Sequence, residues 1–152
     1  MSFSYYFPIN MKNDEYYMKL AYKEALKAYK KGEIPVGAII VSNINGKIIA
    51  KAHNLRDSSQ IITKHAEIIA IEKANKKFKN WRLINCTLYT TLKPCKMCQE
   101  VINSAKLERV VYSSESNNNV TSNTKIIQIN SNDIINDTSI LIKKAFVKIR
   151  KK

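Results

Sequence analysis

Four side chains stand at spacings that could hold a metal ion and move a proton. Cys95 and Cys98 are three residues apart at the expected start of a helix, which places both sulfurs on one side, near the positive end of the helix dipole. This pair suits a metal, although a redox pair, half of a four-cysteine zinc site or chance gives the same spacing. His65 and Glu67 open an apolar, alanine-rich run, where polar side chains are costly to bury without a use.

The third ligand of such a site has to be sought outside the cysteine pair. Cys86 stands alone at the edge of the preceding strand, so four thiolates are not available, and we interpret it as a small core or surface residue. The histidines are His53 and His65, and His65 begins a helix as Cys95 does. Two helix starts could therefore present one imidazole and two thiolates to one ion. Three protein ligands leave a tetrahedral position open, which is typical of catalytic zinc; iron is the alternative metal.

Glu67 gains a role from this arrangement. Residues two apart point in different directions inside a helix, so His65 and Glu67 can share a site only in the first turn. Glu67 could there take a proton from a water molecule whose pKa zinc lowers to about 7, and hand it to a substrate nitrogen. The alternative interpretation is an ordinary carboxylate at a helix N-terminus beside a histidine satisfied in the core.

The periodicity of apolar residues predicts the elements that must position these side chains. Helices are expected at 14–31, 64–77 with Thr63 as its cap, 95–105 and 139–152. Strands are expected at 36–42, 47–52, 86–92, 109–114 and 125–129, with a turn at Gly46 between the first two and a polar loop around "HNLRDSSQ". This order predicts an α/β fold of three layers, with helices on both faces of a mixed sheet.

Length and composition limit the class of protein. A chain of 152 residues corresponds to a single domain, here 1–152, with a core at about 14–114 followed by a strand and a basic helix at about 125–152. No apolar run approaches the roughly 18 residues that cross a bilayer, so no membrane partner is expected. The first residues lack the pattern of a secretory signal, and three cysteines do not suggest a disulfide framework, so we expect a cytoplasmic location.

The net charge of +14 suits a polyanion such as nucleic acid. A compositional explanation competes, because 22 of the 26 basic residues are lysine and the chain is rich in Ile and Asn, as a drift towards A/T-rich codons would produce. Charge alone therefore does not decide between the two.

Two motifs together resemble a known family. His65-Ala66-Glu67 followed by "PCKMC" at 94–98 resembles the zinc-dependent nucleoside and nucleobase deaminases. Three further matches resemble the bacterial tRNA adenosine deaminases, which convert the wobble adenosine of an anticodon to inosine. They are "EIPVGAIIV" at 33–41, Asn54 eleven residues before His65, and "NWRLINCTLYTTLKPCKMC" followed by "RVVYS". The resemblance covers about 14–114 and is weaker afterwards.

The resemblance implies a five-stranded mixed sheet of the cytidine-deaminase type and a homodimer whose two protomers both help to hold the RNA. It implies one zinc ion per subunit on His65, Cys95 and Cys98, with Glu67 as the catalytic acid and base. Asn54 would hydrogen-bond the flipped purine, and the backbone near Ala66 would line its pocket.

The last helix resembles the aromatic and basic helix that borders the RNA in the family. The residues that would contact RNA are Phe146, Lys148, Arg150 and Lys151. The alternative is an amphipathic helix whose charged face is solvated.

Two departures from the family pattern stand out, one next to the metal ligands and one in a loop that lies near the RNA in relatives. The family usually has an acidic residue before the Pro-Cys, where this chain has Lys93. The family's glycine-containing loop after the fourth strand is replaced by "SESNNNVTSNT", and no glycine follows Gly46.

These observations predict hydrolytic deamination of adenosine at the wobble position of tRNA, an arginine tRNA being the expected substrate and its anticodon stem-loop the partner. One alternative is a zinc-dependent deaminase of a free base, nucleoside or nucleotide, such as guanine, cytidine or deoxycytidylate. The other is a non-catalytic zinc protein that binds RNA, against which the intact Glu67 argues.

Overall fold

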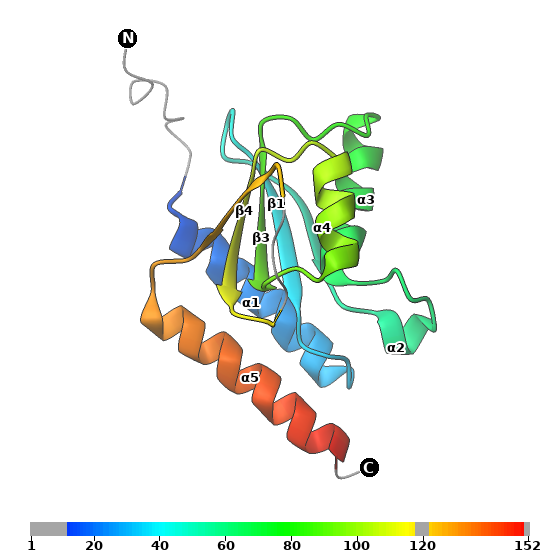
Figure 1. Cartoon of the computed structure of the whole chain (residues 1–152), viewed down its shortest axis with the longest axis vertical. Helices are drawn as coiled ribbons and strands as arrows, with labels where there is room; N and C mark the ends of the chain where they lie inside the picture. The colour runs from blue at the N-terminus through cyan, green and yellow to red at the C-terminus, as the bar shows by residue number, and fades with distance from the viewer. Residues whose placement is uncertain (1–11, 118–121, 151–152) are drawn as a thin grey trace.

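Five helices and five strands are found in the part of the chain that the structure describes (Figure 1). This structure is a computed structural model; it describes residues 12–117 and 122–150, with the backbone alone for residues 149 and 150. The helices are α1 (Asp14–Lys30), α2 (Arg56–Ser59), α3 (Ala66–Phe78), α4 (Lys96–Ser104) and α5 (Asn132–Arg150). The strands are β1 (Gly37–Ser42), β2 (Ile48–His53), β3 (Cys86–Leu92), β4 (Arg109–Ser114) and β5 (Lys125–Gln128).

The strands form one mixed sheet in the order β2-β1-β3-β4-β5. β1 pairs antiparallel with β2 and with β3, whereas β3, β4 and β5 are parallel. All six residues of β1 are buried, because both faces of the sheet are covered. Ile40 packs with α3 and α4 on one face, and its neighbour Ile39 packs with α1 on the other, as the alternation of side chains in a strand requires.

Helices cover both faces of this sheet, so the predicted three-layer fold is confirmed. One apolar core joins α3 and α4 to the face that carries Ala38, Leu88 and Val110. A second core joins α1 and α5 to the opposite face, which carries Tyr89 and Val111. Figure 1 shows the two pairs of helices on opposite sides of the strands.

Gly37 allows α1 to lie directly against the sheet. A Cβ atom at this position would lie 2.0 Å from the carbonyl oxygen of Ala21 and 2.6 Å from the amide nitrogen of Ala25. Both are backbone atoms of α1, so no rotation of a side chain could make room. The absence of a side chain at Gly37 is therefore what permits the close contact between β1 and α1.

Three predictions about the elements are wrong in detail. The segment expected as a loop contains the short helix α2, and Thr63 does not cap α3, because His65 is its N-cap and Thr63 O accepts the His65 N–H in a turn. The last helix begins at Asn132, seven residues before the predicted Ser139, because its polar first turns face outward while Ile134 is buried.

No helix within the described ranges combines the length and the apolar character needed to span a membrane.

Candidate active site

Two helices begin at one edge of the sheet and bring the predicted metal ligands together. β2 and β3 run in the same direction, because each is antiparallel to β1, and α3 and α4 follow them in the chain. His65 is the N-cap of α3, Cys95 is the N-cap of α4, and Cys98 lies in the first turn of α4. Both N-cap residues have extended backbone, with φ of −78° and −71°, so their side chains leave the helix axis.

The three ligand atoms are spaced as a zinc ion needs. His65 Nδ1 lies 3.7 Å from Cys95 Sγ and 3.6 Å from Cys98 Sγ, and all three atoms lie within 4.8 Å of one another. A Zn–N bond of about 2.1 Å and a Zn–S bond of about 2.3 Å at a tetrahedral angle separate N from S by about 3.6 Å. The donor set and its spacing therefore fit zinc, with one coordination position left for a small ligand.

The two thiols share a proton in the metal-free chain. The hydrogen bond from Cys98, backbone hydrogen bonds and the charge of His65 together lower the pKa of Cys95 to about 5, against the opposing effect of burial. The same hydrogen bond, together with burial, raises the pKa of Cys98. Cys95 is therefore a thiolate at neutral pH, which is the form that binds metal.

Glu67 lies next to these ligands in the first turn of α3. Its side chain is only 4% exposed, and burial raises its pKa above the ordinary value for a glutamate. A hydrogen bond from Cys98 opposes this rise. A raised pKa brings a carboxyl group closer to the condition in which it can both accept and donate a proton, which is what general acid and base catalysis requires.

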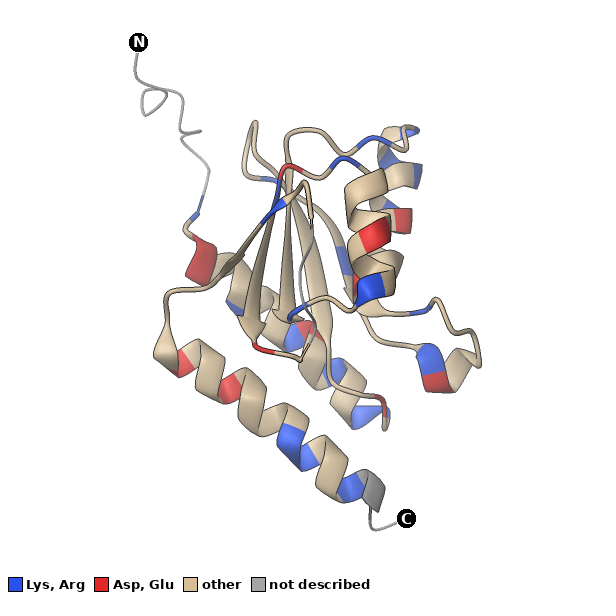
Figure 2. Cartoon of the chain, viewed as in Figure 1, with Lys and Arg blue, Asp and Glu red and all other residues tan. Residues whose placement is uncertain are grey.

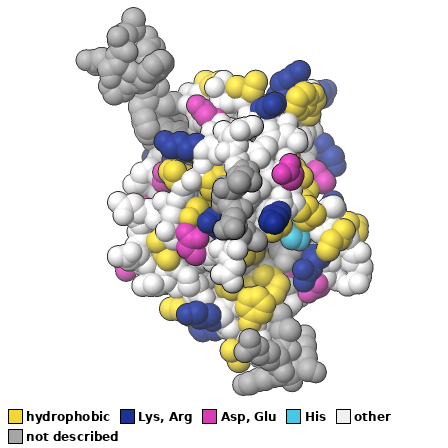
Figure 3. Space-filling model, viewed as in Figure 1, with side chains coloured by type: hydrophobic (Ala, Val, Ile, Leu, Met, Phe, Trp, Pro, Cys, Tyr) yellow, Lys and Arg dark blue, Asp and Glu magenta, His cyan; other side chains and the backbone are white. Residues whose placement is uncertain are grey.

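A pocket of about 120 Å³ opens beside His65 and Glu67. Its lining residues are Ile34, Val36, Asn54, Arg56, His65, Ala66, Glu67, Leu92, Lys93 and Cys95. This volume is well below the roughly 300 Å³ at which pockets begin to hold drug-sized ligands, so it suits a single base rather than a whole nucleotide. Figure 3 shows a histidine side chain reaching the surface on this face of the molecule, with lysine or arginine side chains beside it.

Asn54 forms part of the pocket wall with a fixed orientation. Its Nδ2 donates a hydrogen bond of 3.2 Å to the carbonyl oxygen of Ile34, and its Oδ1 accepts one of 3.1 Å from the backbone N–H of Arg56. An amide NH₂ group has two hydrogens, so one remains for a ligand. Ala66 is fully buried and lines the same pocket.

The match to a known family decides what kind of site this is. Residues 11–114 match the family described as the cytidine and deoxycytidylate deaminase zinc-binding region. The chain belongs to this deaminase family. Its His, Cys and Cys group is thus a candidate zinc site in a zinc-binding family.

Individual relatives within the deaminase family have names that specify a substrate. The tRNA-specific adenosine deaminase of Bacillus subtilis is 51% identical over 102 residues, which are 67% of this chain and 62% of that protein. The chain therefore spans about three fifths of the length of this relative. A solved structure from studies of A-to-I editing by tRNA:A34 deaminases at the wobble position of transfer RNA has a TM-score of 0.70 and 29% identity, and the likeness covers 76% of this chain and 98% of that one. The guanine deaminase structure of Bacillus subtilis has a TM-score of 0.64 and 39% identity, with coverage of 68% and 66%.

Lys93, which departs from the family pattern, has its own partner in this chain. Its ammonium lies 3.3 Å from a carboxylate oxygen of Glu115 and 5.5 Å from the centre of the Tyr112 ring. Glu115 belongs to the segment "SESNNNVTSNT", where the resemblance implies a glycine-containing loop. The two departures from the deaminase pattern therefore meet in one ion pair at the rim of the pocket.

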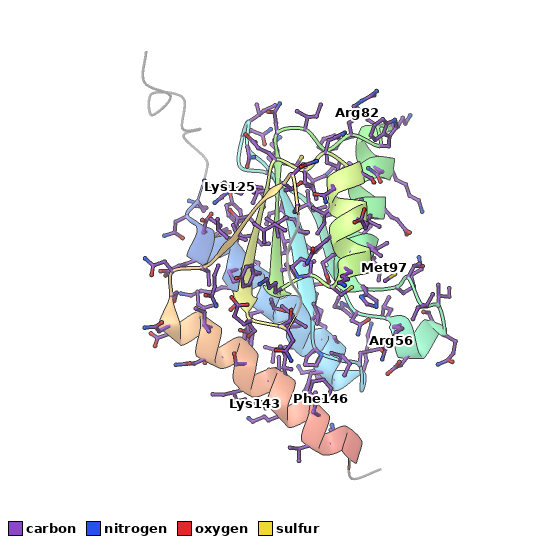
Figure 4. All side chains as sticks on the ribbon, in the orientation of Figure 1. Arg56, Arg82, Met97, Lys125, Lys143 and Phe146 are labelled. Atoms are coloured by element: carbon purple, nitrogen blue, oxygen red, sulfur yellow. The ribbon has the colours of Figure 1, made fainter. Side chains whose placement is uncertain are left out.

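Phe146 and Lys148, two of the four residues expected to contact RNA, lie on α5 and do not line the pocket. Phe146, labelled in Figure 4, is 47% exposed. The Lys148 ammonium lies 4.9 Å from the centre of the Tyr29 ring. A second hollow of about 270 Å³ is lined by Lys148 together with Gly32 and Glu33, the residues that precede the pocket residue Ile34. The side chain of Arg150 and all of Lys151 lie outside the described residues.

Two polar residues near the pocket escaped the sequence analysis. Arg56 lines the pocket from α2, and Glu33, the residue before Ile34, is buried and accepts hydrogen bonds from α2. Figure 4 shows Arg56 on α2 and Met97 at the start of α4. The motif "EIPVGAIIV" could have indicated Glu33, because a glutamate stands there immediately before a run of residues expected to be a buried strand.

Proposed function

We propose that this chain deaminates adenosine to inosine at the wobble position of tRNA, as a zinc-dependent hydrolase. The observation that carries the proposal is the pocket in which Glu67 lies beside His65 and Cys95, within a chain 51% identical to a tRNA-specific adenosine deaminase over 102 residues. A site of three ligands with a buried carboxyl group beside it is more than a structural zinc site requires.

The residues of the pocket have distinct roles in this proposal. His65, Cys95 and Cys98 hold the ion, and bound zinc supplies Lewis-acid activation that lowers the pKa of water to about 7. Glu67 takes the proton that the water loses as it attacks C6 of adenine, and delivers it to the ring nitrogen N1. Glu67 then carries the second proton of the water to the departing amine, so that inosine and ammonia leave.

Asn54 and Ala66 position the base. The free hydrogen on Asn54 Nδ2 is available to a purine acceptor, and its orientation is set by the two bonds to Ile34 and Arg56. The backbone beside Ala66 lines the same pocket. A base enters a pocket of this size only when it is flipped out of its stack, which costs least in a single-stranded loop.

The anticodon stem-loop is the part of the tRNA that we propose is bound, and an arginine tRNA is the substrate that we expect. Phe146 and Lys148, with Arg150 and Lys151 after them, would contact the RNA beyond the target base. The hollow that links Lys148 to Gly32 and Glu33 supports this placement, because it leads from α5 towards the pocket wall. Figure 2 shows that the acidic residues of α5 lie in its first half and the lysines in its second.

We further propose one zinc ion per subunit, a homodimer in which both protomers hold the RNA, and a single-domain organisation over 1–152. The homodimer would extend the basic surface beyond one chain, since a pocket of about 120 Å³ accounts for the base alone.

The experiment that tests the proposed function compares substrates. The purified chain is incubated with an arginine tRNA transcript that carries adenosine at the wobble position, and in parallel with free adenosine, cytidine and guanine. We expect inosine from the tRNA and no product from the free compounds.

Free guanine is the most important of these control substrates, because the guanine deaminase of Bacillus subtilis is 39% identical in sequence. If guanine or cytidine is converted and the tRNA is not modified, the proposed substrate is wrong, whereas the proposed zinc chemistry still stands. Absence of every product from zinc-loaded protein that binds tRNA would favour the non-catalytic alternative.

A further inference from the structure

Glu33 is a buried carboxylate that the proposed chemistry does not use. Its side chain is 2% exposed, and it accepts three hydrogen bonds, all of 2.9 Å, from the backbone N–H groups of Asp57 and Ser58 and from the Ser58 hydroxyl. Among the described residues, no lysine or arginine forms an ion pair with Glu33. A carboxylate buried without a cation is costly, so its place depends on the groups that it accepts from.

These three bonds cap the short helix α2 from a distant part of the chain. Leu55, the N-cap residue of α2, makes no hydrogen bond through its side chain, so the first N–H groups of the helix depend on another acceptor. Glu33 supplies it from 24 and 25 residues away. Its own backbone is anchored to the end of α1, where the Glu33 N–H donates to the Ala28 carbonyl oxygen at 3.0 Å.

Stability of the core does not account for this cap. None of the four residues of α2 is buried, and only its N-cap residue Leu55 packs partly against a core, so holding α2 in place adds little apolar burial. What α2 does contribute is one wall of the pocket, because Arg56 lines it. By holding α2 in place, the Glu33 cap therefore acts on the shape of the pocket.

Asn54 is held on both sides by segments that Glu33 joins. Its Oδ1 accepts from the backbone N–H of Arg56, the first residue of α2, and its Nδ2 donates to the carbonyl of Ile34, the residue after Glu33. The Asn54 N–H also donates to the Val36 carbonyl oxygen at 3.0 Å. If α2 moved away from Glu33, the bond that orients Oδ1 would be lost, and the amide could turn.

We infer that Glu33 is a positioning residue, which fixes α2 and through it the orientation of Asn54 towards the base in the pocket. The inference rests on the proposed function only in that Asn54 contacts the substrate. It also gives the motif "EIPVGAIIV" a physical role, since the motif carries both the clamp at Glu33 and the wall residues Ile34 and Val36.

Glu33→Gln tests the inference, with Glu100→Gln, an exposed position on α4, as the matched control. An amide offers one acceptor oxygen and turns an NH₂ group towards backbone N–H donors, so at least one of the three bonds is lost. With the tRNA transcript we expect the KM of Glu33→Gln to rise about tenfold while kcat stays within about twofold, because the Asn54 hydrogen bond that is weakened holds the base equally in the ground state and the transition state, and Glu67 is untouched. Zinc content should equal that of the parent chain.

A double-mutant cycle shows whether Glu33 acts through Asn54. Adding Glu33→Gln to Asn54→Ala should cost little more than Asn54→Ala alone, because the residue that is being positioned is already absent. Effects that multiply would overturn the inference, as would an unchanged KM in Glu33→Gln. If Glu33→Gln does not fold, Ser58→Ala removes only the hydroxyl bond and should raise KM in the same direction by a smaller factor.

An NMR readout separates this inference from the proposed function. We expect the side-chain NH₂ signals of Asn54 and the backbone amide signals of Asp57 and Ser58 to shift in Glu33→Gln and to stay in place in Glu100→Gln. An unshifted Asn54 side chain would overturn the positioning role. This measurement needs no turnover, so it holds its meaning even if the parent chain leaves tRNA unmodified and the proposed function fails.

Discussion

The carboxylate of Glu67 is 4% exposed and lies two residues after His65, the N-cap of α3. Its burial raises its pKa, and the Cys98 sulfur lies within hydrogen-bond reach of it. Glu33 and Asn54 are also buried and polar, and each is held by several hydrogen bonds. Buried polar side chains are costly, so their concentration around one pocket marks this edge of the sheet as the functional one.

Glu67→Ala should abolish turnover and leave the metal in place. Glu67 is not one of the three ligands, so zinc content measured by atomic absorption should match the parent chain, whereas kcat should fall by about 10²–10⁴ because the proton transfers lose their carrier. Glu100→Ala, on the exposed face of α4, should keep both the zinc content and the kcat of the parent chain. Turnover retained in Glu67→Ala would remove Glu67 from the proposed mechanism.

At the scale of residues, the sequence predicts what depends on local spacing. His65, Glu67, Cys95 and Cys98 were found because a helix start holds residues that are two or three apart in a known relation. The ion pair between Lys93 and Glu115 and the bonds of Glu33 to α2 join residues that are 22 to 25 positions apart. No periodicity links such pairs, so only the folded chain shows them. Whether the site residues act as proposed is a question for the variants.

At the scale of elements, the site depends on two helices that start at the same sheet edge. The alternation of strands and helices predicted this topology, because a strand followed by a helix must pack the helix onto a face of the sheet. α2 was missed because its cap comes from Glu33, far away in the sequence. The sequence did not indicate the start of α5, because its first turns are polar. The side of this helix that is buried becomes apparent only when the helix is packed on the sheet; its residues are Ile134, Thr138, Leu141 and Ala145.

Gly37→Ala should destabilise the fold by separating α1 from β1. The added carbon would lie 2.0 Å from a backbone oxygen of α1, so the helix itself must shift, and we expect a loss of about 3 kcal/mol in the free energy of unfolding, at the upper end for overpacking. Urea unfolding followed by circular dichroism measures the loss.

Gly32→Ala is the matched control for that change. It meets no atom within 4 Å, and its cost of about 1 kcal/mol comes from the left-handed backbone, with φ of +79°. Equal losses in the two variants would contradict the account of the close contact at Gly37.

Asp14 should make stability depend on pH in the acid range. Burial opposes its ionisation, but hydrogen bonds from Arg109 and Tyr89 outweigh burial and lower its pKa below the ordinary 3.8. A carboxyl group whose pKa is lowered in the folded state stabilises the fold above its unfolded pKa, and the stabilisation is lost as the pH falls through the folded pKa.

Asp14→Asn should therefore be less stable than the parent chain near neutral pH, and the difference should shrink as the pH falls below about 4. The expected contribution is about 1 kcal/mol or less, because the Asp14 side chain is 37% exposed and water screens the pair. Thermal unfolding of both chains across this range measures it, and a difference that grows towards acid pH would show the opposite sign.

At the scale of the whole molecule, charge and shape suggest how the proposed tRNA substrate would be held. The net charge is +14, and the pocket has room only for a base, so the proposed tRNA would need further contacts on the surface around it. The second half of α5 carries Lys143, Lys144 and Lys148, and Lys148 borders the hollow next to Glu33. The sequence predicted a basic last helix, but its distance from the pocket depends on how α5 packs across the sheet.

Lys148→Ala should weaken tRNA binding uniformly and reduce its salt dependence. Loss of one phosphate contact lowers the slope of log K against log salt concentration by about 1, because one counterion fewer is released. Binding is measured with the Glu67→Ala chain, so that the RNA is not altered. Lys77→Ala, at the opposite end of α3 from the pocket, is the control and should leave the slope unchanged. Equal slopes for Lys148→Ala and the parent would place the RNA elsewhere.

The most direct test of the central claim is the position of inosine in the product. The chain is incubated with an arginine tRNA transcript that has adenosine at the wobble position, and with a second transcript in which that adenosine is exchanged with its neighbour in the anticodon loop. The products are digested and inosine is located by mass spectrometry. We predict inosine at the wobble position of the first transcript and none in the second. Inosine at the neighbouring position as well, or conversion of free guanine with both transcripts unmodified, would contradict the claim.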